Sequence, residues 1–248
     1  MRPLLRHAAA ASVFFCAGSA AATVRYVWPE SPSSGAGYTN WSTAAHTIQD
    51  AVDAAGAGDV VVVTNGTYAT GGAALPDTTL DNRVCITRAI TLCSVNGPGV
   101  TIIAGGAAPG GGNGDGAVRA AYVCDGAVLC GFTFSNGHTR ASGDPGLEQS
   151  GGNLCCGPAA AVSNCVLVRG SASLLGGGSY QGTLANCTVS GCSAWLGGGA
   201  FDATLRNVTL AANSASAQGG GSYGGALENC IAVGNSAPSV GHCNSMGT

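Results

Sequence analysis

The sequence predicts an all-β solenoid of the parallel β-helix class, with a short helix covering its N-terminal end. Its main support is a unit that is repeated three times between residues 176 and 235. The glycine triplets of this unit begin at Gly176, Gly197 and Gly219, and its asparagines lie at Asn186, Asn207 and Asn229. Both markers give a period of 21 to 22 residues, which is typical of stacked repeat architectures.

The composition of each unit separates this fold from rival repeats. Leucine-rich repeats need a dense leucine framework, whereas each unit here has one or two leucines among small and β-branched residues. Helical repeats need longer units and would not tolerate three consecutive glycines, because glycine is a poor helix former. Coils of about 22 residues with two or three short strands, stacked at about 4.8 Å, fit both observations.

The repeat predicts which side chains face the core and which form turns. Leu184, Leu205 and Leu227 precede the asparagine by two positions and are expected to point inward. The asparagine interrupts the alternation and is expected at a turn, because Asn tolerates the left-handed backbone conformation. Gly131 should hold the same place in an earlier coil. Stacked amides at this turn are expected to form a structural ladder of Asn164, Asn186, Asn207 and Asn229.

Residues 23–58 are expected to lead into the solenoid and to cap it. Thr47 is a suitable N-cap, and the apolar residues after it recur at helical spacing, namely Ile48, Ala51, Val52 and Ala55. Such a helix would cover the open end of the coils, where sheet edges are otherwise exposed. The β-helix is expected over residues 59–248, with Val60–Val63 as its first buried strand.

Composition and the N-terminus predict an exported protein. Residues 1–22 have a positive start, a short apolar run and small residues before Thr23, as in a secretory signal peptide. No later segment is long and apolar enough to predict a membrane span. Only 8% of residues are charged and the net charge is −3, so nothing favours nucleic acid as a partner.

The twelve cysteines are interpreted as structural. Several recur with the coil period, which suits a small buried hydrophobic residue better than a disulfide framework. Cys165 and Cys187, one coil apart, are close enough to bridge in principle, but their parallel side-chain vectors disfavour the geometry. The cysteine spacing matches no zinc pattern, and no metal site is predicted.

Several stretches of the chain resemble a known group of proteins. They are TIQDAVDAAGAGDVVVVTNGTY, AITLCSVNGPGVTII, LCGFTFSNG and the GGG and NCTV units. They resemble bacterial right-handed parallel β-helix proteins with the pectin-lyase-like fold, and the glycine-rich coils are similar to those of autotransporter and polymorphic outer-membrane protein passengers. The resemblance covers nearly the whole chain after residue 22. It implies the fold, whereas the superfamily includes lyases, hydrolases, adhesins and inert stalks.

Three segments interrupt the regular coils, over residues 70–83, 105–119 and 137–152. Loops on a rigid scaffold commonly carry function. The third loop concentrates ionisable side chains in a chain that has few of them, so we take it as the candidate glycan or ion site. Its candidate residues are His138, Arg140, Asp144 and Glu148.

Two enzymatic functions are alternatives to a glycan or ion site in this loop. A polysaccharide lyase similar to pectate lyases would need calcium-binding acids, with Asp125, Asp144, Glu148 and Asp202 as candidates, and a basic residue, with Arg140, Arg169 and Arg206 as candidates. The acids do not recur at coil spacing. A glycoside hydrolase needs converging carboxylates, and no such close-set motif is present. Aromatic residues offer a weaker hypothesis of sugar stacking, at Trp28, Tyr38 and Trp41 and at Tyr180 and Tyr223.

We therefore expect an exported structural or adhesive surface protein without an evident catalytic site. The alternative is a polysaccharide lyase or a glycan-binding module, and calcium would be its cofactor only in the lyase case. Extracellular polysaccharide or a surface glycan is the expected partner. The C-terminal end of the solenoid is expected to be covered by further sequence or by a second chain, because the residues after Asn235 are too few for another coil.

Overall fold

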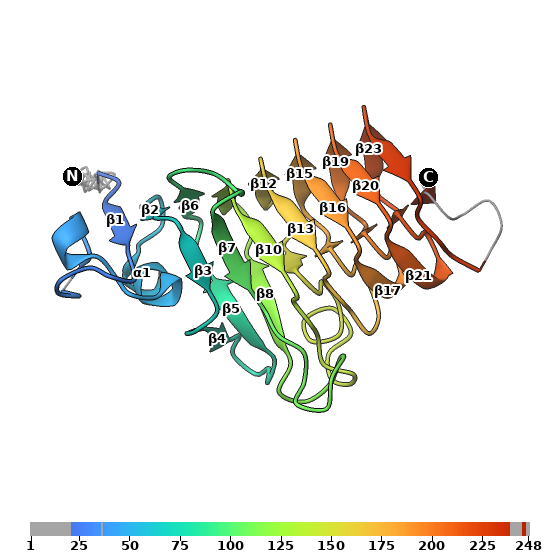
Figure 1. Cartoon of the computed structure of the whole chain (residues 1–248), viewed down its shortest axis with the longest axis horizontal. Coiled ribbons are helices and arrows are strands. Elements are labelled where there is room, and N and C mark those ends of the chain that lie inside the picture. The colour runs from blue at the N-terminus through green and yellow to red at the C-terminus, as the bar shows by residue number, and fades with distance from the viewer. Residues whose placement is uncertain (1–20, 36, 239–244, 247–248) are drawn as a thin grey trace, which may run out of the picture.

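The chain folds into a parallel β-helix in which each regular coil adds one strand to each of three long sheets (Figure 1). The computed structural model describes residues 21–35, 37–238 and 245–246, so the predicted signal peptide lies almost wholly outside the described residues. The described residues contain one α-helix, and it lies near the N-terminal end. The predicted fold class of an all-β parallel β-helix with an N-terminal helix is confirmed.

The strands of one sheet lie beside each other in the order in which the coils follow along the chain. Sheet A contains β1 (Val24–Val27), β2 (Val60–Val63), β6 (Thr91–Ser94), β9 (Val128–Cys130), β12 (Ala161–Ser163), β15 (Thr183–Ala185), β19 (Thr204–Arg206) and β23 (Ala226–Glu228). Sheet B contains β3 (Gly66–Tyr68), β7 (Thr101–Ala104), β10 (Thr133–Ser135), β13 (Val166–Val168), β16 (Thr188–Ser190), β20 (Thr209–Ala211) and β24 (Ile231–Val233).

Sheet C faces the other two and carries most of the outer aromatic residues. It contains β4 (Ala73–Ala74), β5 (Asp81–Ile86), β8 (Val118–Val123), β11 (Leu154–Cys156), β14 (Ser179–Tyr180), β18 (Ala200–Phe201), β22 (Ser222–Tyr223) and β25 (Ser245–Met246). Only β4 joins it antiparallel, beside β5. A small fourth sheet pairs β17 (Ser193–Leu196) with β21 (Ser214–Gln218). After Asn235 the two-residue strand β25 pairs with β22 and extends sheet C, whereas sheets A and B end at β23 and β24.

The core consists of columns of apolar side chains that stack from coil to coil. Leu184 lies in register with Leu205, and Leu205 with Leu227, as the repeat predicted. Leu184 and Leu205 are fully buried, and Leu227 packs against the same cluster. A buried leucine contributes about 1.5–3 kcal/mol relative to its exposed state, so these columns hold neighbouring coils together.

The predicted asparagine turn is the corner between sheets A and B. Its residues all have φ of 52° or 53°, and they are Asn164, Asn186, Asn207 and Asn229. Gly131 holds the same corner in the preceding coil, with φ of 83°. Along the predicted ladder, Asn207 Nδ2 donates to Asn186 Oδ1 at 3.2 Å, whereas Asn164 Nδ2 contacts the Cys130 sulfur at 3.5 Å.

A second left-handed corner, between sheets B and C, was not predicted. Its φ values lie between 51° and 63° at Asn136, Arg169, Gly191, Ala212 and Gly234. The residue types vary too much to give a sequence signal. The backbone geometry of the coil therefore imposes the left-handed conformation even on arginine and alanine, at a cost of order 1–3 kcal/mol each.

In the last two coils the residue after this second corner is an asparagine, and these two residues, Asn213 and Asn235, form a buried polar stack inside the solenoid. Asn213 Oδ1 accepts from the Cys192 N–H at 3.0 Å, and Asn213 Nδ2 donates to Val189 O at 2.9 Å and to Asn235 Oδ1 at 3.0 Å. Asn213 is fully buried. The internal amides thus satisfy backbone groups where the chain turns, and they form a more completely bonded ladder than the outer asparagines do.

The glycine triplets place backbone against backbone where the coils meet at the start of sheet C. A Cβ atom on Gly198 would lie 2.2 Å from the Ser214 carbonyl oxygen, and one on Gly177 would lie 2.3 Å from the Ser193 carbonyl oxygen. The first glycine of each triplet also has a positive φ, for example 64° at Gly197. The repeat of glycine is therefore explained by close packing and turn geometry.

The N-terminal helix caps the solenoid as predicted. Helix α1 (Ile48–Ala54) is capped by the Thr47 hydroxyl, which accepts from the Asp50 N–H at 3.2 Å. The Gln49 side chain bonds the edge of β5, accepting from the Cys85 N–H at 2.7 Å and donating to Cys85 O at 3.3 Å. The lead-in segment also contains β1 and the 3-10 helix η1 (Trp41–Thr43). Sheet A begins with β1, one strand before Val60–Val63, in which Val61 and Val63 are buried.

Within the described residues, the structure contains no helix of the length and apolar character that crossing a membrane requires.

Candidate functional site

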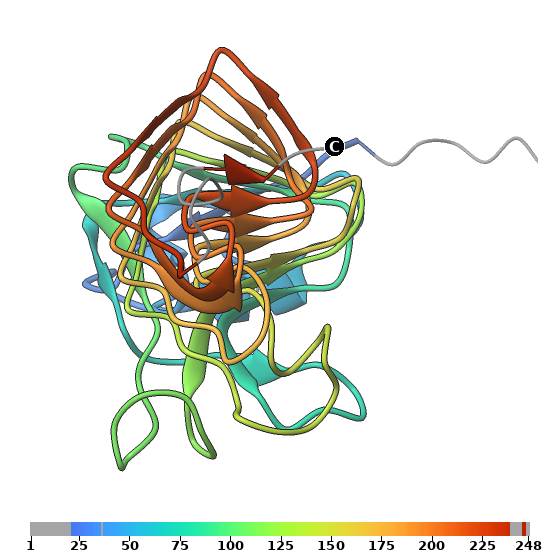
Figure 2. The ribbon, with the colours of Figure 1, turned by 90° about the vertical axis from the view of Figure 1, so that its right-hand side faces the viewer.

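Three loops leave the coils on one side of the solenoid and project together from it (Figures 1 and 2). They run over residues 75–80 between β4 and β5, 105–117 between β7 and β8, and 136–153 between β10 and β11. The first two are shorter than the interruptions we expected, because Arg83 lies in β5 and Arg119 in β8. We call the joined tips of these segments the loop cluster.

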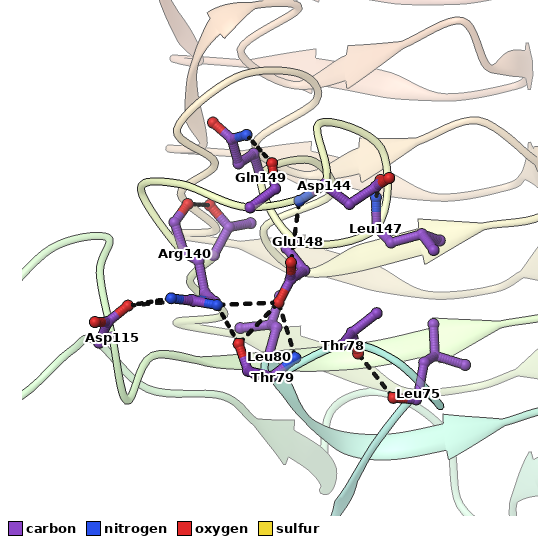
Figure 3. A network of polar contacts seen from close by, with 12 residues as sticks. Leu75, Thr78, Thr79, Leu80, Asp115, Arg140, Asp144, Leu147, Glu148 and Gln149 are labelled. Atoms are coloured by element: carbon purple, nitrogen blue, oxygen red, sulfur yellow. Dashed lines mark hydrogen bonds and ion pairs between the residues drawn. The ribbon is translucent and has the colours of Figure 1, made fainter.

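Glu148 is the centre of the loop cluster, with only 6% of its surface exposed. Its Oε1 accepts from the backbone N–H and the hydroxyl of Thr79, at 2.8 and 2.9 Å, and its Oε2 accepts from the Asp144 N–H at 3.0 Å (Figure 3). These bonds, above all those from the Thr79 and Asp144 backbone, lower the pKa of Glu148 to about 2. Glu148 is therefore an ionised anchor between the first and third loops.

Arg140 connects this anchor to the second loop. Its Nη1 lies 3.2 Å from Glu148 Oε1 and also donates to the Thr79 hydroxyl, and its Nη2 lies 2.6 Å from Asp115 Oδ1 (Figure 3). Hydrogen bonds to Asp115 and then to Glu148 raise the pKa of Arg140. A guanidinium held between two carboxylates stays protonated, so Arg140 is not suited to act as the base of a lyase.

A second arginine fixes the base of the third loop. Arg119 is fully buried and donates to the carbonyl oxygens of Gly151, Leu147 and Ser150, at 2.9, 2.6 and 2.8 Å. Its Nη1 donates to Asn82 Oδ1 at 2.8 Å. Burial lowers the pKa of Arg119, yet its charge is compensated by carbonyl and amide dipoles. No pattern in the sequence marks Arg119 for this role.

The four predicted site residues do not form one site. Arg140 and Glu148 meet, and Asp144 reaches Glu148 only through its backbone N–H. The Asp144 carboxylate accepts from the N–H groups of Gly146 and Leu147, at 2.9 and 2.7 Å, and so closes its own turn. His138 Nδ1 contacts Asn136 O at 2.9 Å, away from this network. Thr79 and Asp115 complete the network, and the sequence did not mark either as a partner.

The loop cluster encloses a small polar pocket of about 260 Å³, lined by Thr79, Asp115, Gly116 and Arg140. Its lining contains the guanidinium of Arg140 and the carboxylate of Asp115, whose side chain is 84% exposed, and the Glu148 carboxylate lies next to the lining, 3.2 Å from Arg140. The local charge is therefore negative and does not favour an anionic sugar acid. The buried carboxylate is already saturated with donors and is not available for proton transfer at neutral pH.

The remaining candidate acids and bases lie at separate corners of the coils. Asp125 accepts from the Ala159 N–H at 2.8 Å, and Asp202 accepts from the Gln181 amide at 3.2 Å. Arg169 donates to Asn136 Oδ1 at 2.9 Å, and Arg206 lies 3.2 Å from Glu228 on sheet A. These four residues thus have separate local partners, and of the acids weighed for a lyase only Glu148 is paired with Arg140 in the structure.

The ten cysteines that the structure describes are free thiols, and most of them are buried. Cys165 and Cys187 stack one coil apart without a disulfide bond. Burial raises the pKa of Cys192 to about 12. Within the described ranges, no group of three or more His, Cys, Asp or Glu side chains is arranged to hold a metal ion.

Comparisons with known proteins assign no family to this chain. No protein-family model matches the chain, and no curated protein matches it. Among solved structures it is similar to a crystal structure of pectin methylesterase in complex with hexasaccharide VII, with 16% sequence identity and a TM-score of 0.48. The alignment covers 89% of this chain and 68% of that chain. At this identity no functional residue is carried over.

Proposed function

We propose that this protein is an exported, non-catalytic β-helix that presents the loop cluster as a rigid adhesive surface toward extracellular polysaccharide or a surface glycan. The observation that carries the proposal is the bonding of Glu148. Both of its oxygens and the guanidinium of Arg140 are used to join three loops to one another. Residues 1–22, with their signal-like composition, support export.

A rigid display surface is consistent with how the loops are held. Glu148 joins the first loop to the third, Arg140 joins the third to the second, and Arg119 fixes the third to the body of the solenoid. Ordering these loops before binding reduces the entropy lost when a partner binds. Leu147, in the third loop, leaves 37% of its surface exposed beside this network and offers an apolar contact.

The test combines a binding assay with assays for turnover. Purified protein is passed over surfaces coated with plant and bacterial polysaccharides, and retention is compared for Leu147→Ser and for Val128→Ser. Val128 is a matched control, because it is also 37% exposed but lies on β9 of sheet A. We expect Leu147→Ser alone to reduce retention, by about threefold or more, as for loss of a central apolar contact.

Turnover is followed by the absorbance of unsaturated uronides, in calcium and in chelator, and by methanol release from methyl-esterified pectin. We expect no turnover. Uronide formation that is abolished by chelator would instead establish the lyase alternative, and equal retention of the two variants would remove the loop cluster as the adhesive surface.

A further inference from the structure

A second pocket lies at the opposite end of the described chain from the repeats, at the carboxyl ends of β1, β2 and β6. It has a volume of about 260 Å³ and is lined by Trp28, Trp41, Thr64, Asn65, Val95 and Asn96. The loop cluster contributes none of these residues. The pocket contains two of the three tryptophans of the chain.

The lead-in segment holds the ring of Trp41 and the backbone of Trp28 in place. Trp41 begins η1, whose N-cap Asn40 accepts from the Thr43 N–H at 3.0 Å. The ring of Trp41 packs on Tyr26, with ring centroids 4.4 Å apart. The backbone N–H of Trp28 donates to Ala45 O at 2.9 Å, beside the capping helix. Even so, Trp41 remains 38% exposed and Val95 49% exposed, so apolar surface faces solvent inside a preformed hollow.

Two asparagine side chains supply hydrogen-bonding groups at this pocket. Asn96 Nδ2 donates to Asn65 Oδ1 at 2.8 Å, and both residues are exposed. This single bond leaves the amino group of Asn65 and the carbonyl oxygen of Asn96 without a protein partner among the described residues. A donor and an acceptor held side by side match the hydroxyl groups of a sugar, each of which both donates and accepts.

We propose that this pocket binds a neutral pyranose residue of a glycan. Aromatic faces pack against the apolar C–H face of a sugar ring, and amide groups bond its hydroxyls, which is the mixed apolar and polar lining of small-molecule sites. None of the lining residues is ionisable, so the site offers nothing to balance the charge of a uronic acid. The volume is below the roughly 300–1,000 Å³ of pockets for drug-sized ligands, which fits one ring rather than a chain.

The other aromatic group of the molecule is less suited to this role. Tyr180, Phe201 and Tyr223 stack on one another along sheet C, with centroids 5.9 and 5.5 Å apart and interplanar angles of 22° and 8°. Phe201 lies between the two tyrosines, so its ring is stacked with a neighbour on each side. This stack therefore serves as a control surface, and the inference does not depend on the proposed role of the loop cluster.

The experiment uses the fluorescence of Trp28 and Trp41 in a Trp195→Phe background, because Trp195 is 48% exposed on β17 and would add an unrelated signal. The protein is titrated with cellotetraose, xylotetraose and β-1,4-galactotetraose, and with tetragalacturonate as the charged comparator. Saturation-transfer NMR of the same sugars gives a second readout that does not rely on a change in emission. In the same background, Trp41→Ala and Asn96→Ala are compared with Phe201→Ala.

We expect at least one neutral tetrasaccharide to bind saturably, with a dissociation constant in the range of about 0.1–10 mM. Trp41→Ala and Asn96→Ala should each weaken this affinity about tenfold or more, and Phe201→Ala should leave it unchanged. Asn96 is exposed, so its variant tests the site even if Trp41→Ala fails to fold. The proposal is overturned if no neutral sugar binds by either readout, if tetragalacturonate binds more tightly, or if the Asn96→Ala protein binds like its parent.

Discussion

Arg119 donates a hydrogen bond to Asn82 across neighbouring strands β8 and β5, with Nη1 and Oδ1 2.8 Å apart, at a site where both side chains are buried. The remaining donors of Arg119 point to three carbonyl oxygens at the end of the third loop. Buried guanidinium groups commonly pair with a carboxylate, and here neutral oxygens take that place. One side chain thus joins three carbonyl groups of the loop to Asn82 on β5.

Replacing Arg119 with methionine should destabilise this region strongly. Loss of the donors leaves three carbonyl oxygens and the Asn82 side-chain oxygen without a partner, which we expect to cost about 3–5 kcal/mol. The stability of Arg119→Lys should lie between those of the parent protein and Arg119→Met, since lysine keeps the charge with fewer donors. Denaturant unfolding measures the effect, and Arg206→Met, whose exposed pair with Glu228 is worth at most about 1 kcal/mol, is the control. Equal effects of the two substitutions would contradict the anchoring role.

The loop cluster should lose stability in acid. The pKa of Glu148 is about 2 in the folded protein, below its value in the unfolded chain of about 4.3, so its stabilisation is complete above that unfolded value and disappears as the pH falls toward 2. Amide hydrogen exchange of Thr79 and Asp144, corrected for the intrinsic pH dependence, should accelerate over this window. Glu148→Gln should show fast exchange already at pH 7, and Asp115→Asn is the exposed control. Protection that persists unchanged to pH 2 would argue against the carboxylate as the anchor.

The buried amide stack should matter more than the outer one. Asn213→Ala removes bonds to Cys192, Val189 and Asn235 in the interior, and we expect a loss of about 2–4 kcal/mol. Asn207→Gly removes the outer ladder bond but keeps the left-handed corner accessible, so its cost should be below about 1 kcal/mol. Thermal unfolding of the two variants makes the comparison, and a larger loss for Asn207→Gly would show that the outer ladder dominates.

The glycine triplets should be intolerant of even one methyl group. In Gly198→Ala the new Cβ would lie 2.2 Å from Ser214 O, a contact that neighbouring backbones cannot relieve without separating the coils. We expect a loss of about 3 kcal/mol or more, or failure to fold. Gly99→Ala is the control, because nothing lies within 4 Å of its added Cβ. Circular dichroism and soluble yield measure both, and a stable Gly198→Ala protein would contradict the close-packing explanation.

The sequence by itself determined the coils. The spacing of the glycine triplets and of the corner asparagines predicted the fold and the inward leucines, because a stacked repeat places the same residue in the same local environment in every coil. The capping helix was predicted separately, from Thr47 and the helical spacing of the apolar residues after it. Because the period reflects the local backbone geometry of each coil, the coils can be predicted from the sequence alone. Where the environment tolerates several residue types, as at the corner of Arg169, Gly191 and Ala212, the signal was lost.

Only the tertiary structure decided how the interruptions are joined. Glu148 lies 69 residues from Thr79 along the chain and Arg140 lies 25 from Asp115, and no period relates them. The same holds for Trp41 and Asn96, which meet because β1, β2 and β6 are adjacent strands. Loops and chain ends are positioned by the register of the sheets beneath them and by side-chain bonds between them. Such contacts are specific to one pair of positions, so a repeat pattern does not contain them.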